Sequence, residues 1–245
     1  MPHFLVKKEE IKGNLIELSD NDSFFHLTRV LRVKTDEIVK FIDENQNIYE
    51  SKIKELKKSS LKAEIIKTYK SQRFLKHNLF LVQSILANDA QNLLIANATQ
   101  TGVKGIYPVI SDNVSPSAKT LKNKVEKWQK IAYENFKQCE RADIPVVFEI
   151  SDLKDTLYNF KKENVLIFAE RDENCSLNDC LKDITKNEPI AAVIGPEGGF
   201  SQREFDFFKE QNYKLISLGK MIYKAPNAVV AGISNIVSRL DNENV

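Results

Sequence analysis

Apolar residues in the first 70 positions fall in short runs separated by polar turns, a pattern typical of β-strands. One polar cluster, Asp43–Asn47, separates two of these runs and indicates a tight turn. Several short strands in so few residues predict a small β-barrel. The predicted strands are Phe4–Val6, Leu15–Leu18, Ile38–Ile42, Ile48–Tyr49 and Leu61–Ile66.

One helical segment, from about Asp22 to Leu31, interrupts this strand pattern. At the α-helical period, Phe25 and Val30 are expected to face inward, while Arg29 and Arg32 point away. The segment would then offer two guanidinium groups to an anionic partner.

From Leu79 onward, longer apolar runs alternate with amphipathic segments. The clearest amphipathic segment, Leu121–Cys139, has apolar residues at steps of three and four, and Ser201 with Glu204 fits a capping box that opens another helix. Alternating strands and helices predict a mostly parallel, three-layered α/β sheet. We therefore divide the chain into residues 1–72 and 73–245. The predicted buried strands are Leu79–Leu86, Gly105–Ile110, Val146–Ile150, Val165–Ala169, Ile190–Ile194 and Leu215–Leu218.

Charge is balanced overall but segregated locally. With 36 basic and 34 acidic residues among 245, the net charge is +2, which excludes the strongly basic class of proteins that coat DNA without sequence preference. Residues 52–76 nevertheless hold nine basic and two acidic side chains, a local net charge of +7. This segment fits either a surface that binds RNA phosphates or a strand edge that lysines keep from aggregating.

Other compositional signals narrow the class of protein. The N-terminus lacks the apolar stretch of a signal peptide, and runs such as Val165–Ala169 are too short to span a bilayer, so we expect a soluble, cytoplasmic protein without a membrane partner. Cys139, Cys175 and Cys180 form no CxxC pair and the three histidines are scattered. We therefore expect idle thiols, no disulfide framework and no metal site.

Glycine is scarce, with eight residues, yet three of them lie in Gly195–Gly199, directly after a predicted strand. The carboxyl edge of a parallel sheet is where such folds bind ligands, although a tight structural turn explains the cluster equally well. The loop matches neither GxGxxG nor a phosphate-binding loop, which disfavours a dinucleotide site and a nucleoside triphosphatase. A second glycine-bearing loop, Leu218–Asn227, precedes the last helix, with Pro226 suited to its first turn.

Four segments, in chain order, resemble the RsmE family, the bacterial small-subunit rRNA uridine-N3 methyltransferases of the SPOUT superfamily. They are HLTRVLR at His26–Arg32, QCER at Gln138–Arg141, IGPEGGFS at Ile194–Ser201, and Leu218-Gly219. The resemblance covers essentially the whole chain, and GPEGGFS with the downstream Leu-Gly is its most specific part.

This resemblance implies a PUA-like, RNA-binding barrel followed by a SPOUT domain, a parallel α/β sheet whose last segment threads a C-terminal trefoil knot. It also implies that S-adenosyl-L-methionine binds in the knot, and that the chain acts as a homodimer on 16S rRNA within the small ribosomal subunit. The cofactor contacts carried over are Ile194, Gly195, Pro196, Glu197, Gly198, Gly199, Leu218, Gly219, Ile222, Tyr223 and Lys224.

The resemblance further places Arg141 against the target uridine. Our hypothesis is that Arg141, with Lys224, stabilises negative charge on the uracil oxygens while N3 attacks the methyl group. No side chain in the sequence is an obvious general base. Arg29, Arg32 and Arg73 are the candidates for contact with the rRNA backbone.

The chain departs from the common family pattern near the predicted chemistry. Lys224 stands where the family commonly has arginine, Pro226 where it has glutamate, and Cys139-Glu140 where it has serine and glycine. Two alternatives therefore stay open. One is a non-catalytic RNA-binding or ribosome-assembly protein on the same fold, and the other is a SPOUT methyltransferase for another rRNA or tRNA nucleotide.

Overall fold

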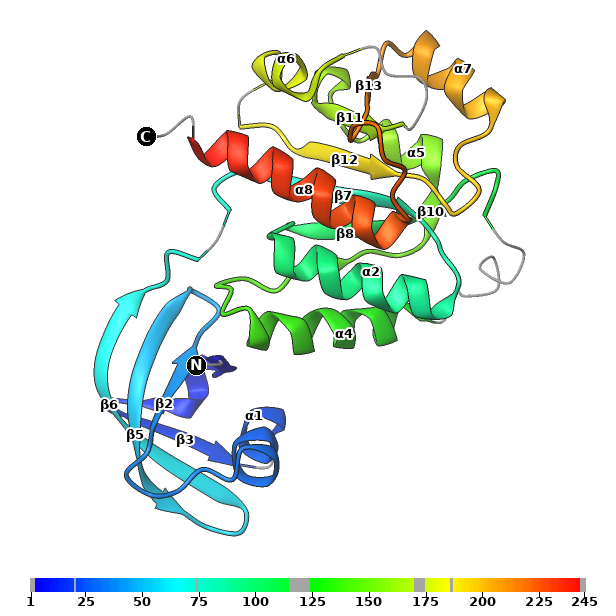
Figure 1. Ribbon diagram of the computed structural model, residues 1–245. Helices are drawn as coiled ribbons and strands as arrows, with labels where there is room; N and C mark the ends of the chain where they lie inside the picture. The colour runs from blue at the N-terminus through cyan, green and yellow to red at the C-terminus, as the bar shows by residue number, and fades with distance from the viewer. Residues whose placement is uncertain are drawn as a thin grey trace. The chain divides into compact units, whose positions relative to one another are not determined.

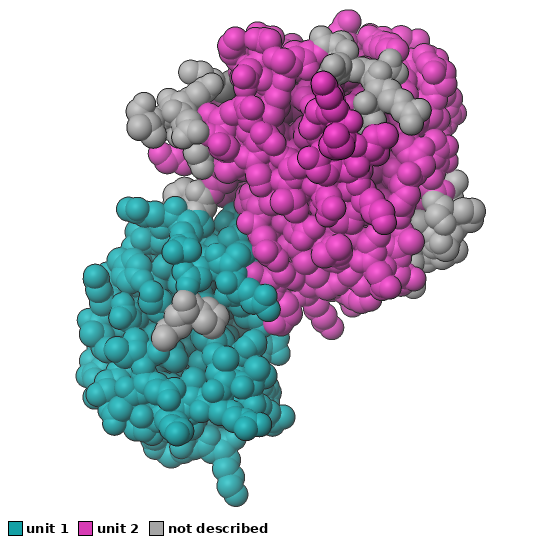
Figure 2. Space-filling view, in the orientation of Figure 1, with its two compact units in different colours: residues 1–74, 136–143 teal, residues 75–135, 144–245 magenta. Residues whose placement is uncertain are grey.

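The computed structural model divides the chain into two compact units (Figure 2). Unit 1 comprises residues 1–74 and 136–143, and unit 2 comprises residues 75–135 and 144–245. The predicted division after residue 72 lies close to the break after 74, but the sequence did not indicate that 136–143 belongs with unit 1. The structure describes residues 3–19, 21–73, 75–114, 124–169, 175–185 and 187–242.

Unit 1 is built on a six-stranded sheet of order β1-β4-β5-β6-β3-β2. Strands β2, β3, β5 and β6 are labelled in Figure 1. Strands β1 and β4 pair in parallel, and the other neighbours pair antiparallel. Phe4, Phe24 and Phe41 lie at the centre of its core. The strands are β1 (His3–Leu5), β2 (Ile11–Lys12), β3 (Leu15–Ser19), β4 (Ile38–Ile42), β5 (Asn47–Leu56) and β6 (Ser60–Lys70). The short helices are η1 (Lys8–Glu10), α1 (Asp22–Phe25) and the π-helix η2 (His26–Val30).

The helical segment of unit 1 differs from prediction at Val30, which is 66% exposed instead of facing inward. Helix α1 runs directly into η2, where the Leu31 N–H donates to the His26 carbonyl at 3.0 Å. A π-turn holds more residues than an α-turn, so a side chain placed at the α-helical period is rotated off the inner face. Arg29 and Arg32 are exposed, as predicted.

Unit 2 contains a seven-stranded sheet in which every pairing is parallel, as the apolar runs predicted. The strand order is β10-β8-β7-β12-β11-β13 (Figure 1). Strand β9 also pairs with β8. The strands are β7 (Leu79–Ser84), β8 (Gly105–Ile110), β9 (Val146–Val147), β10 (Ser151–Asp152), β11 (Val165–Phe168), β12 (Ile190–Ile194) and β13 (Lys214–Ile216). The strand predicted over Val146–Ile150 is thus reduced to two residues.

Helices cover both faces of this sheet and complete the three layers. Buried side chains of α2, α4, α6 and α8 pack on one face, and those of α5 and α7 pack on the other. The helices are α2 (Asn88–Thr101), α4 (Val125–Gln138), α5 (Leu153–Leu157), η4 (Lys162–Asn164), α6 (Leu177–Lys182), α7 (Gln202–Glu210) and α8 (Ala225–Asn242). Ser201 and Glu204 form the predicted capping box of α7. Helix α4 confirms the amphipathic segment from residue 125 onward, whereas residues 121–123 lie outside the described ones.

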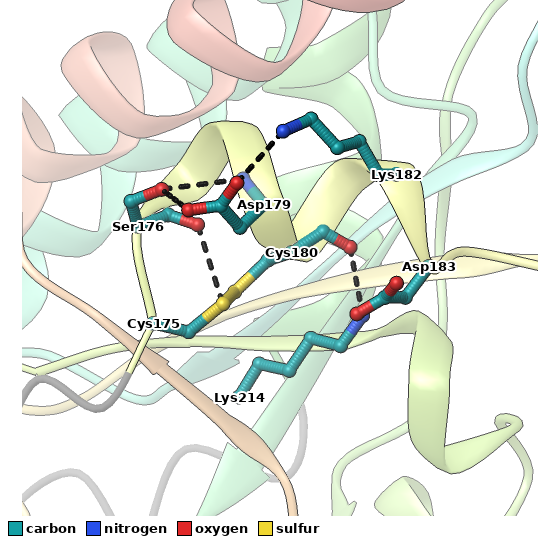
Figure 3. Close-up of a disulfide and its surroundings, with 7 residues drawn as sticks. All are labelled: Cys175, Ser176, Asp179, Cys180, Lys182, Asp183 and Lys214. Atoms are coloured by element: carbon teal, nitrogen blue, oxygen red, sulfur yellow. Dashed lines mark hydrogen bonds and ion pairs between the residues drawn. A yellow bond between two sulfur atoms is a disulfide. The ribbon is translucent and has the colours of Figure 1, made fainter.

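Cys175 and Cys180 form a disulfide, so the prediction of idle thiols is wrong for this pair (Figure 3). Ser176 caps α6 by accepting a hydrogen bond from the Asp179 N–H at 3.2 Å. The first turn of this helix brings the residue before the cap to a Cα–Cα distance of 6.1 Å from Cys180, a proximity that a spacing of five residues does not reveal. Cys139 is a free thiol, as predicted.

None of the helices within the described residues is long and apolar enough to cross a membrane.

A hydrogen-bonded carboxylate organises the turn between β4 and β5. Asp43 accepts bonds from the backbone N–H groups of Asn45 at 2.9 Å and Asn47 at 2.8 Å, from the Asn47 amide at 2.8 Å and from the Tyr49 hydroxyl at 2.9 Å. Burial opposes ionisation of Asp43, but the bonds from Asn47, Tyr49 and Asn45 outweigh it and hold the pKa of this carboxyl below its ordinary value.

The substitution Asp43→Asn is expected to lower the free energy of unfolding by about 1–3 kcal/mol at neutral pH, because an amide cannot accept all four bonds. The stabilisation by Asp43 is complete above its unfolded-state pKa of about 4 and is lost as pH falls through the lower folded-state pKa. The difference between wild type and D43N in urea denaturation should therefore shrink as pH falls below about 4 and through the lower folded-state pKa. Asp36→Asn, which removes an exposed carboxylate paired with Lys52, is the control with a small effect. A D43N deficit that is the same at all pH values would contradict the assignment.

Candidate functional site

The glycine-rich loop Gly195–Gly199 leaves the carboxyl end of β12 and leads into α7. Its backbone is tightly packed at the start, since a Cβ atom added to Gly195 would lie 3.2 Å from the Phe200 ring. Gly199 has φ +69°, a left-handed conformation that favours glycine. The loop therefore presents bare backbone at the strand edge where parallel sheets bind ligands.

A second loop leaves the carboxyl end of β13 and leads into α8. Gly219 has φ +105°, and its N–H donates to the Ser217 hydroxyl at 3.0 Å. Ala225 and Pro226 begin α8, where the Lys224 carbonyl accepts from the N–H groups of Asn227 and Ala228. Pro226 thus occupies the first helical turn, as predicted.

The two loops enclose one cavity of about 510 Å³ at the carboxyl edge of the sheet. This volume lies in the range of about 300–1,000 Å³ that is typical of small-molecule sites. All the residues predicted to bind the cofactor contribute to the wall except Ile222 and Lys224, which are exposed. The wall is formed by Phe168, Ala169, Ile194, Gly195, Pro196, Glu197, Gly198, Gly199, Phe200, Gln202, Phe205, Ile216, Ser217, Leu218, Gly219, Met221, Tyr223, Ala225 and Ala228.

Residues after β8, which the sequence analysis did not single out, hold the glycine-rich loop from outside the cavity. The Asn113 amide donates to the Gly199 carbonyl at 3.1 Å and lies 3.4 Å from that of Gly198. Asp112 accepts bonds from the Ser201 hydroxyl at 2.5 Å and from Arg203 Nε at 3.1 Å. The hydrogen bonds from Arg203 and Ser201 hold the pKa of Asp112 below its ordinary value, so the carboxylate is charged at neutral pH.

Glu204 connects the same two segments through the protein interior. Its side chain is almost fully buried, and its two oxygens accept the backbone N–H groups of Asp112 at 2.9 Å and of Ser201 at 2.7 Å. Glu204 was predicted only as half of a capping box. Its bond to Asp112 spans distant parts of the chain, and no local spacing rule could have indicated it.

The predicted catalytic side chains do not line the cavity. Arg141 belongs to unit 1, is 5% exposed, and its Nη2 atom lies 3.1 Å from Asp143 Oδ1. Lys224 is exposed at the start of α8. Their catalytic roles stay predictions.

The predicted RNA-binding arginines all lie in unit 1. Arg29 and Arg32 are exposed at the end of η2. Arg73 is also exposed, but its Nη1 atom lies 3.3 Å from Glu140 Oε2. Within the described residues, no cluster of three or more histidine, cysteine or acidic side chains is placed to hold a metal ion.

The substitution Glu204→Gln is expected to lower the free energy of unfolding by about 1–3 kcal/mol, because an amide nitrogen would face one of two buried N–H donors. Urea denaturation checks the effect. The control is Glu210→Gln, an exposed carboxylate at the other end of α7, which should leave stability nearly unchanged. Equal stability of E204Q and wild type would show that the bonds to Asp112 and Ser201 are not important to the fold.

Comparisons with known proteins relate both parts of the chain to RNA methyltransferases. A family model described as an RNA methyltransferase domain matches residues 74–237, and one described as an RNA methyltransferase PUA domain matches residues 18–66. The ribosomal RNA small subunit methyltransferase E of Mesomycoplasma hyopneumoniae is 32% identical, covering 85% of this chain and 92% of that protein. The protein of the same name from Aquifex aeolicus is 28% identical, covering 94% and 97%.

A solved structure supports the same relationship. The crystal structure of ribosomal RNA small subunit methyltransferase E from Neisseria gonorrhoeae, bound to S-adenosyl methionine, superposes with a TM-score of 0.83 at 26% identity. The match covers 98% of each chain. These findings confirm the resemblance read from the four motifs and the PUA-like plus SPOUT fold class, while the threading of the last segment stays a prediction. The chain belongs to the ribosomal RNA small subunit methyltransferase E family.

Proposed function

We propose that this chain transfers a methyl group from S-adenosyl-L-methionine to N3 of a uridine in 16S rRNA of the small ribosomal subunit. The observation that carries the proposal is the cavity between the two glycine-bearing loops, in a chain whose relatives are named as methyltransferases of this rRNA. We further propose that the enzyme acts in the cytoplasm as a homodimer.

The cavity fits the proposed cofactor in size and chemistry. Phe168, Ile194 and Leu218 offer apolar surface, while the loops that carry Gly198 and Gly219 leave polar backbone groups accessible. Such a mixture suits a nucleoside that has both a flat ring and polar edges. S-adenosylmethionine, when bound, supplies a methyl group activated by its positively charged sulfur.

The chain's own contribution is alignment and charge stabilisation. The loops fix the position of the donor, which removes much of the entropic cost of bringing two reactants together. Arg141 is proposed to stabilise the negative charge that develops on the uracil oxygens, with Lys224 as a second cation. In the described structure Asp143 pairs with Arg141 and holds its guanidinium in place.

The decisive experiment supplies labelled S-adenosylmethionine and unmethylated small ribosomal subunits to the purified chain, and maps the methylated nucleotide in the 16S rRNA. Label at N3 of one uridine is the expected result. Cofactor binding without transfer would support a non-catalytic assembly protein. Transfer to tRNA or to another rRNA position would support the related methyltransferase.

The substitution Gly219→Val tests the cavity. At φ +105° a β-branched side chain is strained, and it also adds bulk at the wall, so the affinity for S-adenosylmethionine should fall about tenfold or more. Isothermal titration calorimetry measures this affinity. The matched control is Gly13→Val in unit 1, where φ is +62°, which brings similar strain and should leave cofactor affinity unchanged. Equal affinities for the two variants would contradict the placement of the cofactor.

The substitution Arg141→Ala tests charge stabilisation. It should lower kcat for methyl transfer about 100-fold, the usual loss when one preorganised donor is removed, with the cofactor Kd unchanged. Because R141A leaves Asp143 without its guanidinium partner, the double variant Arg141→Ala with Asp143→Asn serves as a control. Both variants should be slow if the cation is needed. Recovery of the rate in the double variant would show that Arg141 only neutralises Asp143.

A further inference from the structure

A short exposed turn of unit 1 combines unpaired cations, exposed apolar side chains and an irregular backbone. We call it the basic tip and define it as Arg29, Val30, Leu31, Arg32 and Lys34. The basic tip begins in the last two residues of the π-helix η2 and continues beyond it, and Arg32 has φ +53°, a left-handed backbone for a residue with a long side chain. Both π-turns and strained non-glycine residues are frequent at functional sites.

Adjacent apolar side chains are exposed at the basic tip. Val30 is 66% exposed and Leu31 is 45% exposed, whereas the next residue, Val33, is buried and anchors the turn through a hydrogen bond from its N–H to the Leu27 carbonyl at 3.1 Å. A single exposed apolar residue is ordinary. Two consecutive exposed apolar residues, placed between cations on a constrained turn, indicate a binding surface.

The cations of the basic tip differ from most of the lysines of β5 and of the turn that follows it, which are paired with carboxylates. Within the described residues, Arg29, Arg32 and Lys34 have no carboxylate partner. In β5, in β6 and in the turn between them, by contrast, four lysines of the basic segment 52–76 are paired with carboxylates. The pairs are Lys52–Asp36 at 2.8 Å, Lys54–Glu64 at 2.9 Å, Lys57–Glu55 at 2.6 Å and Lys62–Glu17 at 2.8 Å. Carboxylates thus neutralise these four lysines, whereas the positive charges of the basic tip remain available to bind an anion.

An aromatic ring orients one of these cations in advance. The Arg29 guanidinium lies 4.4 Å from the centre of the Phe25 ring. Phe25 in turn packs edge-on against the buried Phe24, with 5.5 Å between ring centres. A guanidinium held on a ring loses less freedom when it binds an anion, and its outer edge remains open to a phosphate.

We infer that the basic tip binds unpaired nucleotides of the rRNA, with Arg29, Arg32 and Lys34 on phosphates and Val30 and Leu31 against the faces of nucleobases. The inference rests on the proposed function. To the arginines predicted from the sequence it adds Lys34, the apolar pair Val30 and Leu31, and the unpaired form of the RNA that they contact. Phosphates alone would need only the cations. The apolar pair favours unpaired RNA, because base faces are accessible to side chains only where the helix is interrupted.

The charge part is tested with the full chain and a transcript of its own 16S rRNA, by filter binding between about 50 and 200 mM salt. The triple variant R29A/R32A/K34A should reduce the slope of log affinity against log salt by about 2, the value for three phosphate contacts on unpaired RNA. The matched control removes the same number of charges from the strands, as K54A/K57A/K62A, and should change the slope by much less. A control that flattens the slope as much as the tip variant would overturn the inference.

The apolar part is tested with the double variant V30S/L31S. Its affinity for the transcript should fall severalfold with an unchanged salt slope, and a fully paired RNA duplex should bind wild type and variant equally. Unchanged affinity for the transcript would overturn the apolar contact, and a loss of self-association in sedimentation would assign the pair to a second copy of the chain. Melting temperatures confirm that the variants fold. Methylation is not the readout, so a wild type that binds RNA without methylating it would refute the proposed function and leave this comparison intact.

Discussion

The candidate site depends on holding a backbone loop at the edge of a parallel sheet without placing side chains in the space that a ligand needs. Glycines keep that space free, but they also increase the conformational freedom of the loop backbone. Hydrogen bonds from residues outside the cavity restrict the loop. The buried carboxylate of Glu204, together with Asp112 and Asn113, ties it to the segment after β8. The rigidity of the cavity thus comes from residues that do not line it.

Sheet pairing places those residues where they are needed. Strands β7 and β8 pair in parallel next to β12, so the segments that leave their carboxyl ends emerge at the same edge as the glycine-rich loop. Asp112 and Ser201 are far apart in sequence and meet only because of this topology. In the same sheet β13 pairs in parallel with β11. The second loop, which follows β13, therefore begins at that edge as well.

Local patterns predicted what depends on local forces. Continuous apolar runs located the buried strands of unit 2, and Ser201 with Glu204 located the start of α7, because burial and capping act over a few residues. The helical and strand periods gave wrong side-chain directions or strand lengths where the backbone departs from regular geometry. The π-turn exposes Val30. An irregularity in pairing at Glu50/Ser51 shifts the inward phase of β5, so the apolar alternation does not reveal that the strand continues from the predicted Ile48–Tyr49 to Leu56. Contacts between distant segments, such as Asn113 with Gly199, leave no sequence pattern to read.

Residues 136–143 belong to unit 1, although the chain segments on both sides of them belong to unit 2. The polypeptide crosses between the units three times, after residues 74, 135 and 143. A single cleavage therefore cannot separate the two units: a fragment that ends at residue 74 lacks Arg141 and its neighbours, and the remainder carries them without the rest of unit 1. Each unit is thus made of two separate segments of the chain, and neither contains all of its residues in one continuous stretch.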